Sequence, residues 1–507
     1  MDFIGTSGND NYLGTVDADE FDMSQGGRDT VSGLEGDDVY LFGSGLRGNE
    51  QIDGGADHDT VVLAGNYLFG LVFGPTTMVN VEEIVCEAGF SYTLAIDDAT
   101  ATDLFFYVDA HTLAAGESLD FDGTAETAAI IDIEGGEGDD VLSVGYRGTF
   151  RLGEGGSDTA IGGSGKNTFF TYDDLDSTDV LVGGASTLDT VSIAGDYSAG
   201  LTITAAMMSS VELLEIFAAY NGTFIVEDAV TAAGVTTRLL MTSFTAPAGM
   251  DVTFDASAET DAFWNLQGGV SDDFFLGGQL GDEFDMRDAG SGGQGGDDEL
   301  FGDDGDDVFL FDGQFTRFDE VDGGDGFDEL RLEGDLSAGV NFAGVTMEDI
   351  EQLVLEAGFD YVLTVGDNNV NADGFTVLAD TLGSADTLSY DGAAELGRDV
   401  IVLGGAGGDT VTTGGGAAAS RPNTGAVGRT TDAESARIAV RSILGVFFIT
   451  GGQRLCRAYG LGPPQTLRSG VAVARRNECG PQHVSRIIAD STRLRRNPNS
   501  TCSDCNC

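Results

Sequence analysis

The stretch Gly268–Arg331 decides the fold. It contains the nine-residue units GGVSDDFFL (268–276), GGQLGDEFD (277–285), GQGGDDELF (293–301), GDDGDDVFL (302–310) and GGDGFDELR (323–331). Each unit has a glycine-rich first half, an acid at position six and a large apolar residue at position eight. Glycine permits the positive backbone angles of a tight turn, which leaves room for only a very short strand. Because such a strand cannot bury its apolar side chain alone, the units predict a solenoid of stacked turns.

The position-six acids predict rows of carboxylates along this solenoid. Like charges in a row repel unless a cation lies between them. Carboxylate and carbonyl oxygens on flexible turns favour Ca²⁺ over Mg²⁺ or Zn²⁺. Asx-turns are the alternative role for Asp in such turns, but they do not explain the regular spacing. The predicted metal-site residues are Asp10, Asp19, Asp29, Asp38, Glu50, Asp59, Gly135, Asp140, Asp158, Asp179, Asp189, Gly268, Asp273, Asp282, Asp298, Gly302, Asp307, Asp319, Asp328, Gly404 and Asp409.

These units resemble the calcium-binding nonapeptide of the RTX (hemolysin-type) family, G-G-x-G-x-D-x-U-x, in which U is a large apolar residue. The resemblance implies a parallel β-roll in which two nonapeptides make one turn of about eighteen residues. It also implies that Ca²⁺ lies between successive turns, held by the position-six Asp and turn carbonyls. Members of this family are bacterial proteins exported unfolded by a type I system through an uncleaved C-terminal signal. No such signal is recognisable at the basic C-terminal end of this chain.

The composition changes near Gly416. Of the 507 residues, 1–416 hold 10 basic and 81 acidic side chains, a formal charge of −71, whereas 417–507 hold 13 basic and five acidic ones. We expect so acidic a body to avoid nucleic acid and anionic membrane surfaces. With Cys86 as its single cysteine, the body has no disulfide framework. No secretory signal peptide and no membrane-spanning run are expected.

A module of about 135 residues occurs three times in the body. The matching stretches FDGTAET, FDASAET and YDGAAEL begin at Phe121, Phe254 and Tyr390. Val81-Glu82, Val211-Glu212 and Met347-Glu348 are also matched. Each module joins a nonapeptide block to a segment with the period-two alternation of strands. The predicted blocks are 1–62, 133–190, 267–331 and a truncated 404–416, and the strand-rich segments are 63–132, 191–266 and 332–403.

The sequence therefore predicts an all-β, elongated parallel β-roll or β-helix solenoid. Its expected core includes the position-eight residues Tyr40, Leu142, Phe275 and Phe309. Its position-five acids are expected to be solvated or to add charge near the ion rather than to be ligands: Asp139, Asp272 and Asp306.

Residues 417–507 follow a different pattern. They are rich in arginine, interrupted by proline and aperiodic, which predicts disorder, with Ile438–Thr450 set apart as an apolar run. An out-of-frame or foreign end is one interpretation, and a small basic, cysteine-containing domain is the other. The terminal Cys502, Cys505 and Cys507 have no second cysteine pair or histidine nearby, which favours free thiols over a metal site.

No catalytic motif is found in the sequence. The three histidines do not form H-E-x-x-H, and G-x-S-x-G is missing. The predicted function is that of a secreted, extracellular calcium-binding repeat protein in which Ca²⁺ drives folding. It would serve as a structural or adhesive array, with calcium ions and cell-surface or matrix polysaccharide as partners. The alternative is a calcium-binding accessory region of a secreted hydrolase, lyase or epimerase, acting on polysaccharide or protein, whose catalytic domain is absent.

Overall fold

The computed structural model confirms the predicted all-β class, because its described residues form strands and turns and no α-helix. It describes residues 1–98, 104–186, 188–217, 221–228, 230, 236–241, 251–287, 295–342, 344–366, 369, 374–394, 400–413, 418–421, 446–449, 453–456 and 472–475. The chain divides into two compact units, Met1–Leu336 with Val340–Ile350, and Ser337–Gly339 with Glu351–Cys507.

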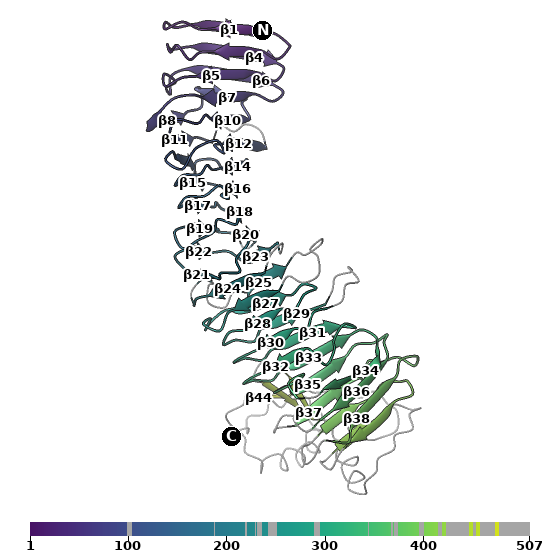
Figure 1. The fold of residues 1–507 in the computed structure, drawn as a ribbon. Coiled ribbons are helices and arrows are strands. Elements are labelled where there is room, and N and C mark those ends of the chain that lie inside the picture. The colour runs from purple at the N-terminus through teal and green to yellow at the C-terminus, as the bar shows by residue number, and fades with distance from the viewer. Residues whose placement is uncertain are drawn as a thin grey trace, which may run out of the picture. The chain divides into compact units, whose positions relative to one another are not determined.

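In the first unit every turn contributes a strand to one parallel sheet, the continuous sheet (Figure 1). Neighbouring strands pair in register one turn apart. Its strands, in spatial order, are β1 (Asp2–Ile4), β3 (Glu20–Asp22), β5 (Val39–Phe42), β7 (Thr60–Leu63), β10 (Glu83–Cys86), β12 (Phe105–Asp109), β14 (Ile130–Glu134), β16 (Arg147–Arg151), β18 (Thr168–Tyr172), β20 (Thr190–Ile193), β23 (Leu213–Ile216), β25 (Thr236–Met241), β27 (Phe263–Gln267), β29 (Glu283–Asp285), β31 (Val308–Asp312) and β33 (Glu329–Glu333).

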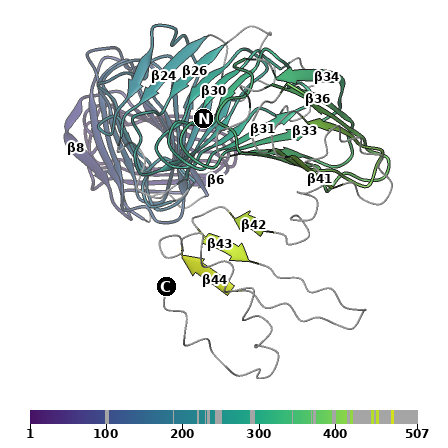
Figure 2. The same cartoon turned by 90° about the horizontal axis from the view of Figure 1, so that it is seen from below.

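The rest of the wall of this unit consists of three separate parallel sheets, and the turns overlap as stacked rings in Figure 2. The first contains β2 (Asn11–Leu13), β4 (Thr30–Glu35), β6 (Gln51–Ala56) and β9 (Met78–Val79). The second contains β8 (Tyr67–Phe73), β11 (Tyr92–Ile96), β13 (Leu119–Gly123), β15 (Val141–Val144), β17 (Thr159–Ile161), β19 (Val180–Val182) and β22 (Met208–Ser209). The third contains β21 (Leu201–Ile203), β24 (Gly222–Val226), β26 (Val252–Asp255), β28 (Phe274–Leu276), β30 (Glu299–Phe301) and β32 (Glu320–Asp322).

The second unit repeats the same plan. β35 (Gln352–Leu355), β37 (Phe375–Leu378), β39 (Val400–Leu403) and β41 (Ala418–Arg421) pair in parallel, as do β36 (Tyr361–Val365), β38 (Leu388–Gly392) and β40 (Thr410–Thr413). β34 (Leu336–Phe342) contains residues assigned to both units. Further along, β42 (Val446–Ile449), β43 (Gln453–Cys456) and β44 (Ala472–Arg475) pair antiparallel. The remainder of the tail predicted to be disordered lies outside the described residues.

Position-eight side chains form the core, as the repeat pattern predicts. Tyr40, Leu142, Phe275 and Phe309 are each fully buried. Because strands stack in register, aromatic rings stack along the solenoid axis, and the rings of Phe284 and Phe309 lie 4.7 Å apart at 12°. These rings provide the largest apolar area of each turn.

Removal of one stacked ring should destabilise the first unit strongly. Phe309→Ala is expected to lower the free energy of unfolding by about 3–5 kcal/mol, because the stacked turns leave little freedom to fill the cavity. Phe69→Ala is the matched control, since Phe69 is fully exposed and should change stability by less than about 0.5 kcal/mol. Chemical denaturation followed by circular dichroism measures both, and equal effects would contradict the stacked core.

The turns vary in length more than the nonapeptide rule implies. Hydrogen bonds between position-six residues of successive turns join residues 18 to 25 positions apart, whereas the resemblance implies about eighteen throughout. Each block contains one twelve-residue step between position-six residues, such as Asp307 to Asp319. The residue eight positions after the start of the step is buried in all three blocks: Leu46, Leu175 and Phe315. Each longer step therefore adds one buried apolar side chain, an apolar plug, to its turn.

The strand-rich segments transfer the chain from one of the separate sheets to the next. β8 is the first strand of the second sheet and precedes β9, the last strand of the first sheet. In the same way, β21 begins the third sheet before β22 ends the second.

The structure corrects one of the predicted matches between modules. Positive φ angles at Asn80, Ser210 and Asp349 precede strands β10, β23 and β35 in the same way, so Ile350-Glu351, rather than Met347-Glu348, corresponds to Val81-Glu82.

Candidate metal-binding site

The position-six acids form columns, each acid immediately before a strand. Three columns precede the continuous sheet and three precede the separate sheets, so each nonapeptide block of the first unit carries two. The columns before the continuous sheet are Asp19–Asp38–Asp59, Asn167–Asp189 and Asp282–Asp307–Asp328. Those before the separate sheets are Asp10–Asp29–Glu50, Asp140–Asp158–Asp179 and Asp273–Asp298–Asp319.

Within a column, most carboxylates accept the backbone N–H of the position-six residue one turn earlier. The backbone N–H of Asp140 donates to Oδ1 of Asp158 at 2.9 Å, and that of Asp158 donates to Oδ1 of Asp179 at 2.9 Å. The N–H of Asp282 donates to Oδ1 of Asp307 at 2.6 Å in the third block. The N–H at the start of each short strand is thereby satisfied by the next turn.

The second oxygen often caps its own turn. Oδ2 of Asp140 accepts the N–H of Gly136 at 2.8 Å, and Oδ2 of Asp282 accepts that of Gly278 at 2.7 Å. This is the Asx-type turn considered as the alternative role, and it stabilises the glycine turn without an ion. The position-six acids therefore perform this structural role whether or not they also bind a metal.

Several of these carboxylates nevertheless keep one buried oxygen without a hydrogen-bond partner. The residues that contain such an Oδ2 atom are Asp38, Asp59, Asp189, Asp307 and Asp409. Their side chains are almost completely buried, with at most 5% exposure. Burial of an unsatisfied oxygen is costly, so a position of this kind indicates a missing proton or cation.

The unpartnered oxygen of Asp307 faces another oxygen. A Cβ atom added to Gly302 would collide with Oδ2 of Asp307 and would lie 2.5 Å from the carbonyl oxygen of Gly323, one turn further on. Two electron-rich atoms therefore border the same small space, which only a glycine at position one leaves open. Asp59 is arranged in the same way, with Gly54 at position one and the carbonyl of Asn80 opposite.

Asn167 shows what satisfies these carbonyl groups. It takes the place of Asp in its column, and its Nδ2 donates to the carbonyl oxygens of Gly165 and Gly183, each at 2.7 Å. Gly183 lies 16 residues after Asn167, as Gly323 lies after Asp307. Where the column has an amide, the carbonyl receives a hydrogen bond, and where it has a carboxylate, an additional positive charge or proton is needed.

Burial raises the pKa values of many carboxylates in the columns. Desolvation raises the pKa of Asp59 and Asp273 to about 7, that of Asp140, Asp282 and Asp319 to about 6, and that of Asp158, Asp298 and Asp307 to about 8. The preceding carboxylate of the column adds to the shift at Asp158, Asp298 and Asp307. These groups are therefore poised between protonation and cation binding near neutral pH.

The buried carboxylate and carbonyl oxygens fit a hard, oxygen-ligated cation such as Ca²⁺ better than a soft metal. Some predicted residues fit less well. Glu50 accepts only from N–H groups near it in sequence, those of Arg47 and Asn49. Gly268 leaves space for the methyl group of Met286. In the second unit, Gly404 follows β39, and Oδ1 of Asp409 accepts the N–H of Leu388 at 3.1 Å.

The contacts of two groups of acids were missed from the sequence, one group within the columns and one beside them. Glu82 and Glu212 extend the columns before the continuous sheet, accepting the N–H groups of Asp59 at 2.8 Å and Asp189 at 3.0 Å. Their recurrence after Val81 and Val211 was the available signal. The second group is the position-five acids, which are exposed as predicted but accept an N–H one turn later. These acceptors are Asp139, Asp272 and Asp306, with Ser157, Asp297 and Phe327 as donors at 2.8–3.0 Å.

The fold and the columns together define a parallel β-solenoid repeat protein with buried rows of carboxylates. No protein-family model matches the chain, and no curated protein matches it. Among the described residues there is also no helix with the length and hydropathy needed to cross a membrane.

Proposed function

We propose that this chain is an extracellular calcium-binding repeat protein of the RTX type, in which Ca²⁺ at the glycine turns drives folding of the solenoid. The carrying observation is the buried Oδ2 of Asp307 opposite the carbonyl oxygen of Gly323, at the place where Asn167 makes hydrogen bonds in its own column. Ca²⁺ takes six to eight oxygen ligands and tolerates irregular geometry, which suits two oxygens from successive turns.

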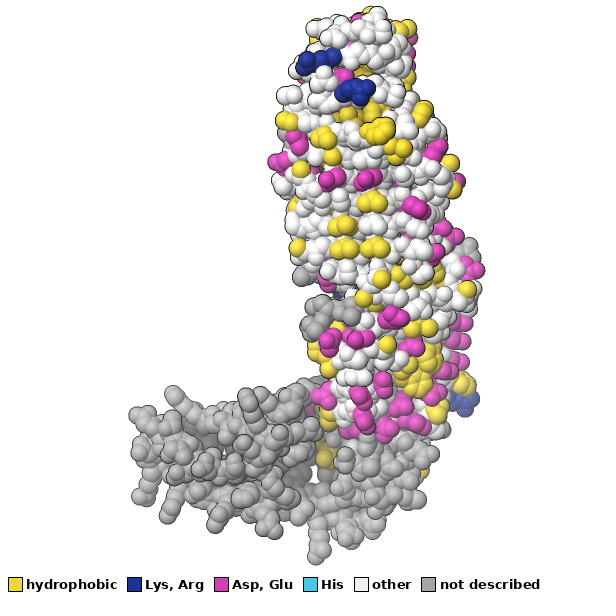
Figure 3. All heavy atoms as spheres, turned by 90° about the vertical axis from the view of Figure 1, so that its left-hand side faces the viewer, with side chains coloured by type: hydrophobic (Ala, Val, Ile, Leu, Met, Phe, Trp, Pro, Cys, Tyr) yellow, Lys and Arg dark blue, Asp and Glu magenta, His cyan; other side chains and the backbone are white. Residues whose placement is uncertain are grey.

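Charge supports a requirement for cations. Residues 1–416 carry a formal charge of −71, and the face in Figure 3 shows many more acidic than basic side chains. Compaction of such a chain without counterions is opposed by repulsion. A ligand that binds only the folded state at a hundred times its Kd adds about 2.7 kcal/mol per site. Several sites of this kind would make folding conditional on the millimolar Ca²⁺ found outside cells, which is the basis for proposing secretion.

The repeated modules suit a structural or adhesive array. Each module of the first unit adds parallel strands that pair in register, so the solenoid presents rows of outward side chains. We infer that such rows contact an extended, repetitive partner, and cell-surface or matrix polysaccharide has that character. The array role needs no catalytic group.

Asp307→Asn tests the ion site directly. The amide keeps the acceptor for the N–H of Asp282 but removes the charge. In calcium-free buffer at pH 8 the variant should be more stable than wild type by roughly 2–4 kcal/mol, because the unpaired buried charge is gone. In millimolar Ca²⁺ the variant should be less stable than wild type, because one site is weakened. Retention of β-sheet circular dichroism in chelator at pH 8, where wild type should lose most of it, measures the first effect, and chemical denaturation in millimolar Ca²⁺ measures the second.

Asp306→Asn is the matched control. Asp306 is the neighbouring acid, is exposed, and accepts the N–H of Phe327 through one oxygen. Its substitution removes the same charge outside the column, so stability should change by less than about 0.5 kcal/mol in either buffer. Similar changes in stability in the two variants would show that the Asp307 column does not bind an ion.

A further inference from the structure

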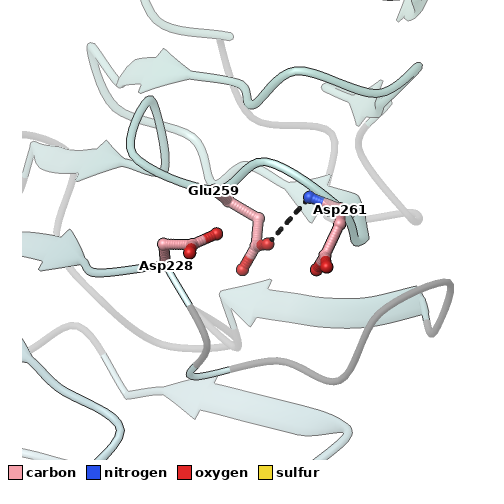
Figure 4. Close-up of side chains that lie close together, drawn as sticks. All are labelled: Asp228, Glu259 and Asp261. Carbon is pink, nitrogen blue, oxygen red and sulfur yellow. Dashed lines mark hydrogen bonds between the residues drawn. The ribbon is translucent and has the colours of Figure 1, made fainter.

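A second group of carboxylates lies outside the nonapeptide blocks. Asp228, Glu259 and Asp261 each place a carboxylate oxygen within 4.8 Å of the others (Figure 4). Asp228 follows β24, whereas Glu259 and Asp261 lie in the turn between β26 and β27. The group therefore joins two successive turns of the second strand-rich segment. Glu259 is fully buried, and Asp228 and Asp261 are exposed at the entrance.

The preceding module repeats the arrangement. Asp98 follows β11 there, and Glu126 lies in the turn after β13. Thr127 donates from its backbone N–H and its hydroxyl to Oδ1 of Asp98, as Thr260 does to Oδ1 of Asp228.

The buried glutamate of this earlier copy contains an unpartnered oxygen. Oε1 of Glu126 accepts the N–H groups of Ala128 and Ala129, in the way that Oε1 of Glu259 accepts that of Asp261. The other oxygen, Oε2 of Glu126, is buried without a partner in a side chain only 1% exposed. Because the hydrogen-bond pattern is shared, Oε2 of Glu126 occupies the place where the second copy gathers its three carboxylates.

We propose that Asp228, Glu259 and Asp261 form a second class of Ca²⁺ site, located in the strand-rich segment, and that Asp98 and Glu126 form a weaker version one module earlier. Three carboxylate oxygens supply half or fewer of the ligands of Ca²⁺, which leaves positions for water at the exposed entrance. Mg²⁺ gives up its water shell less readily and fits this set less well. The earlier copy has Ala128 where the second has Asp261, so it lacks one carboxylate.

Such an ion would tie two turns together where no nonapeptide does so. In each copy the carboxylates are separated by about thirty residues in sequence and meet only through stacking of the turns. The ion would therefore stabilise the strand-rich segment independently of the glycine turns. This assignment does not depend on calcium binding at the nonapeptide blocks.

The test uses the full chain and two variants. Trp264, the single tryptophan, lies in β27 directly after the site, so energy transfer from its indole to Tb³⁺ reports ions bound nearby. Asp282, whose Oδ1 accepts the N–H of Trp264, marks the nearest nonapeptide site and supplies the control variant Asp282→Asn. The double variant with Asp228→Asn and Asp261→Asn should lower the Ca²⁺ stoichiometry measured by calorimetry by one. It should also abolish a component of the sensitised Tb³⁺ emission that remains in Asp282→Asn.

A gain-of-site variant keeps the test valid if the double variant folds poorly. Ala128→Asp supplies the third carboxylate beside Asp98 and Glu126, and should strengthen Ca²⁺ binding there about tenfold. Wild-type stoichiometry and emission in the double variant, or unchanged binding in Ala128→Asp, would overturn the assignment. If only the nonapeptide variants lose bound ions, calcium binding at the nonapeptides is supported and this site is not. The two proposals can therefore be tested separately.

Discussion

Protein stripped of Ca²⁺ at pH 8 should lose most of its β-sheet circular dichroism and regain it in millimolar Ca²⁺. In the stripped state the ionised columns would bury the charges of residues such as Asp158, Asp298 and Asp307, each beside the preceding carboxylate of its own column. Burial of unpaired charge costs several kcal/mol per group, and a domain is stable by only about 5–15 kcal/mol in total. A few uncompensated sites therefore suffice to unfold the first unit.

The measurement is a titration of the stripped full-length protein with Ca²⁺, followed by addition of chelator. Mg²⁺ at the same concentration is the control for general charge screening, and it should restore little structure because it keeps its water shell. A full β spectrum in chelator at pH 8 would contradict calcium-coupled folding. So would equal recovery in Mg²⁺, since that would indicate screening rather than specific sites.

Acidification should stabilise the calcium-free protein. The pKa values of the buried carboxyls are raised to about 6–8, above the ordinary value near 3.9 of the unfolded chain. A raised carboxyl pKa means that the folded state binds protons more tightly, so its contribution is complete below about pH 4 and is lost as the pH rises through the folded pKa. For Asp298, with a pKa of about 8, the loss between pH 5 and pH 8 is roughly 3–4 kcal/mol.

Calcium should reverse this dependence. Ca²⁺ binds the ionised carboxylates, so its binding releases protons and weakens as the pH falls through the same range. Thermal denaturation in calcium-free buffer should therefore show a cooperative transition at pH 5 that weakens or is lost at pH 8, and in millimolar Ca²⁺ the higher Tm should be at pH 8. Calorimetry in buffers of different ionisation enthalpy measures the released protons. A Tm that rises with pH in both conditions would show that the buried carboxyls do not control stability.

The repeat pattern was enough to predict the class of fold and the core. A period of nine with an apolar residue at position eight forces stacking, because one short strand cannot bury Phe309 or Tyr40 alone. The pattern also located the columns, since an acid that recurs in register must align with its copies. Phe284 and Phe309 are stacked for the same reason.

The partners of those acids could not be predicted, because they depend on three-dimensional register. The donor to Asp307 is the N–H of Asp282, 25 residues earlier, and that distance changes from turn to turn with the apolar plugs. Asp228 and Glu259 likewise lie far apart in sequence and meet only after two turns have stacked. A local sequence motif does not specify contacts between residues so far apart in the chain. The correction at Ile350-Glu351 had the same origin, because only the strands that follow reveal the alignment.

The change of partner sheet at β8/β9 and at β21/β22 has a mechanical consequence for the first unit. One sheet is shared by all of its turns, whereas the others end and restart, so each acid column that precedes a separate sheet stops at the border of its own block. Ion binding in one such column can then promote binding in the next turns of the same block, but not beyond its border. Under tension, the solenoid should unfold in discrete steps, one block at a time, and each block could refold independently of its neighbours.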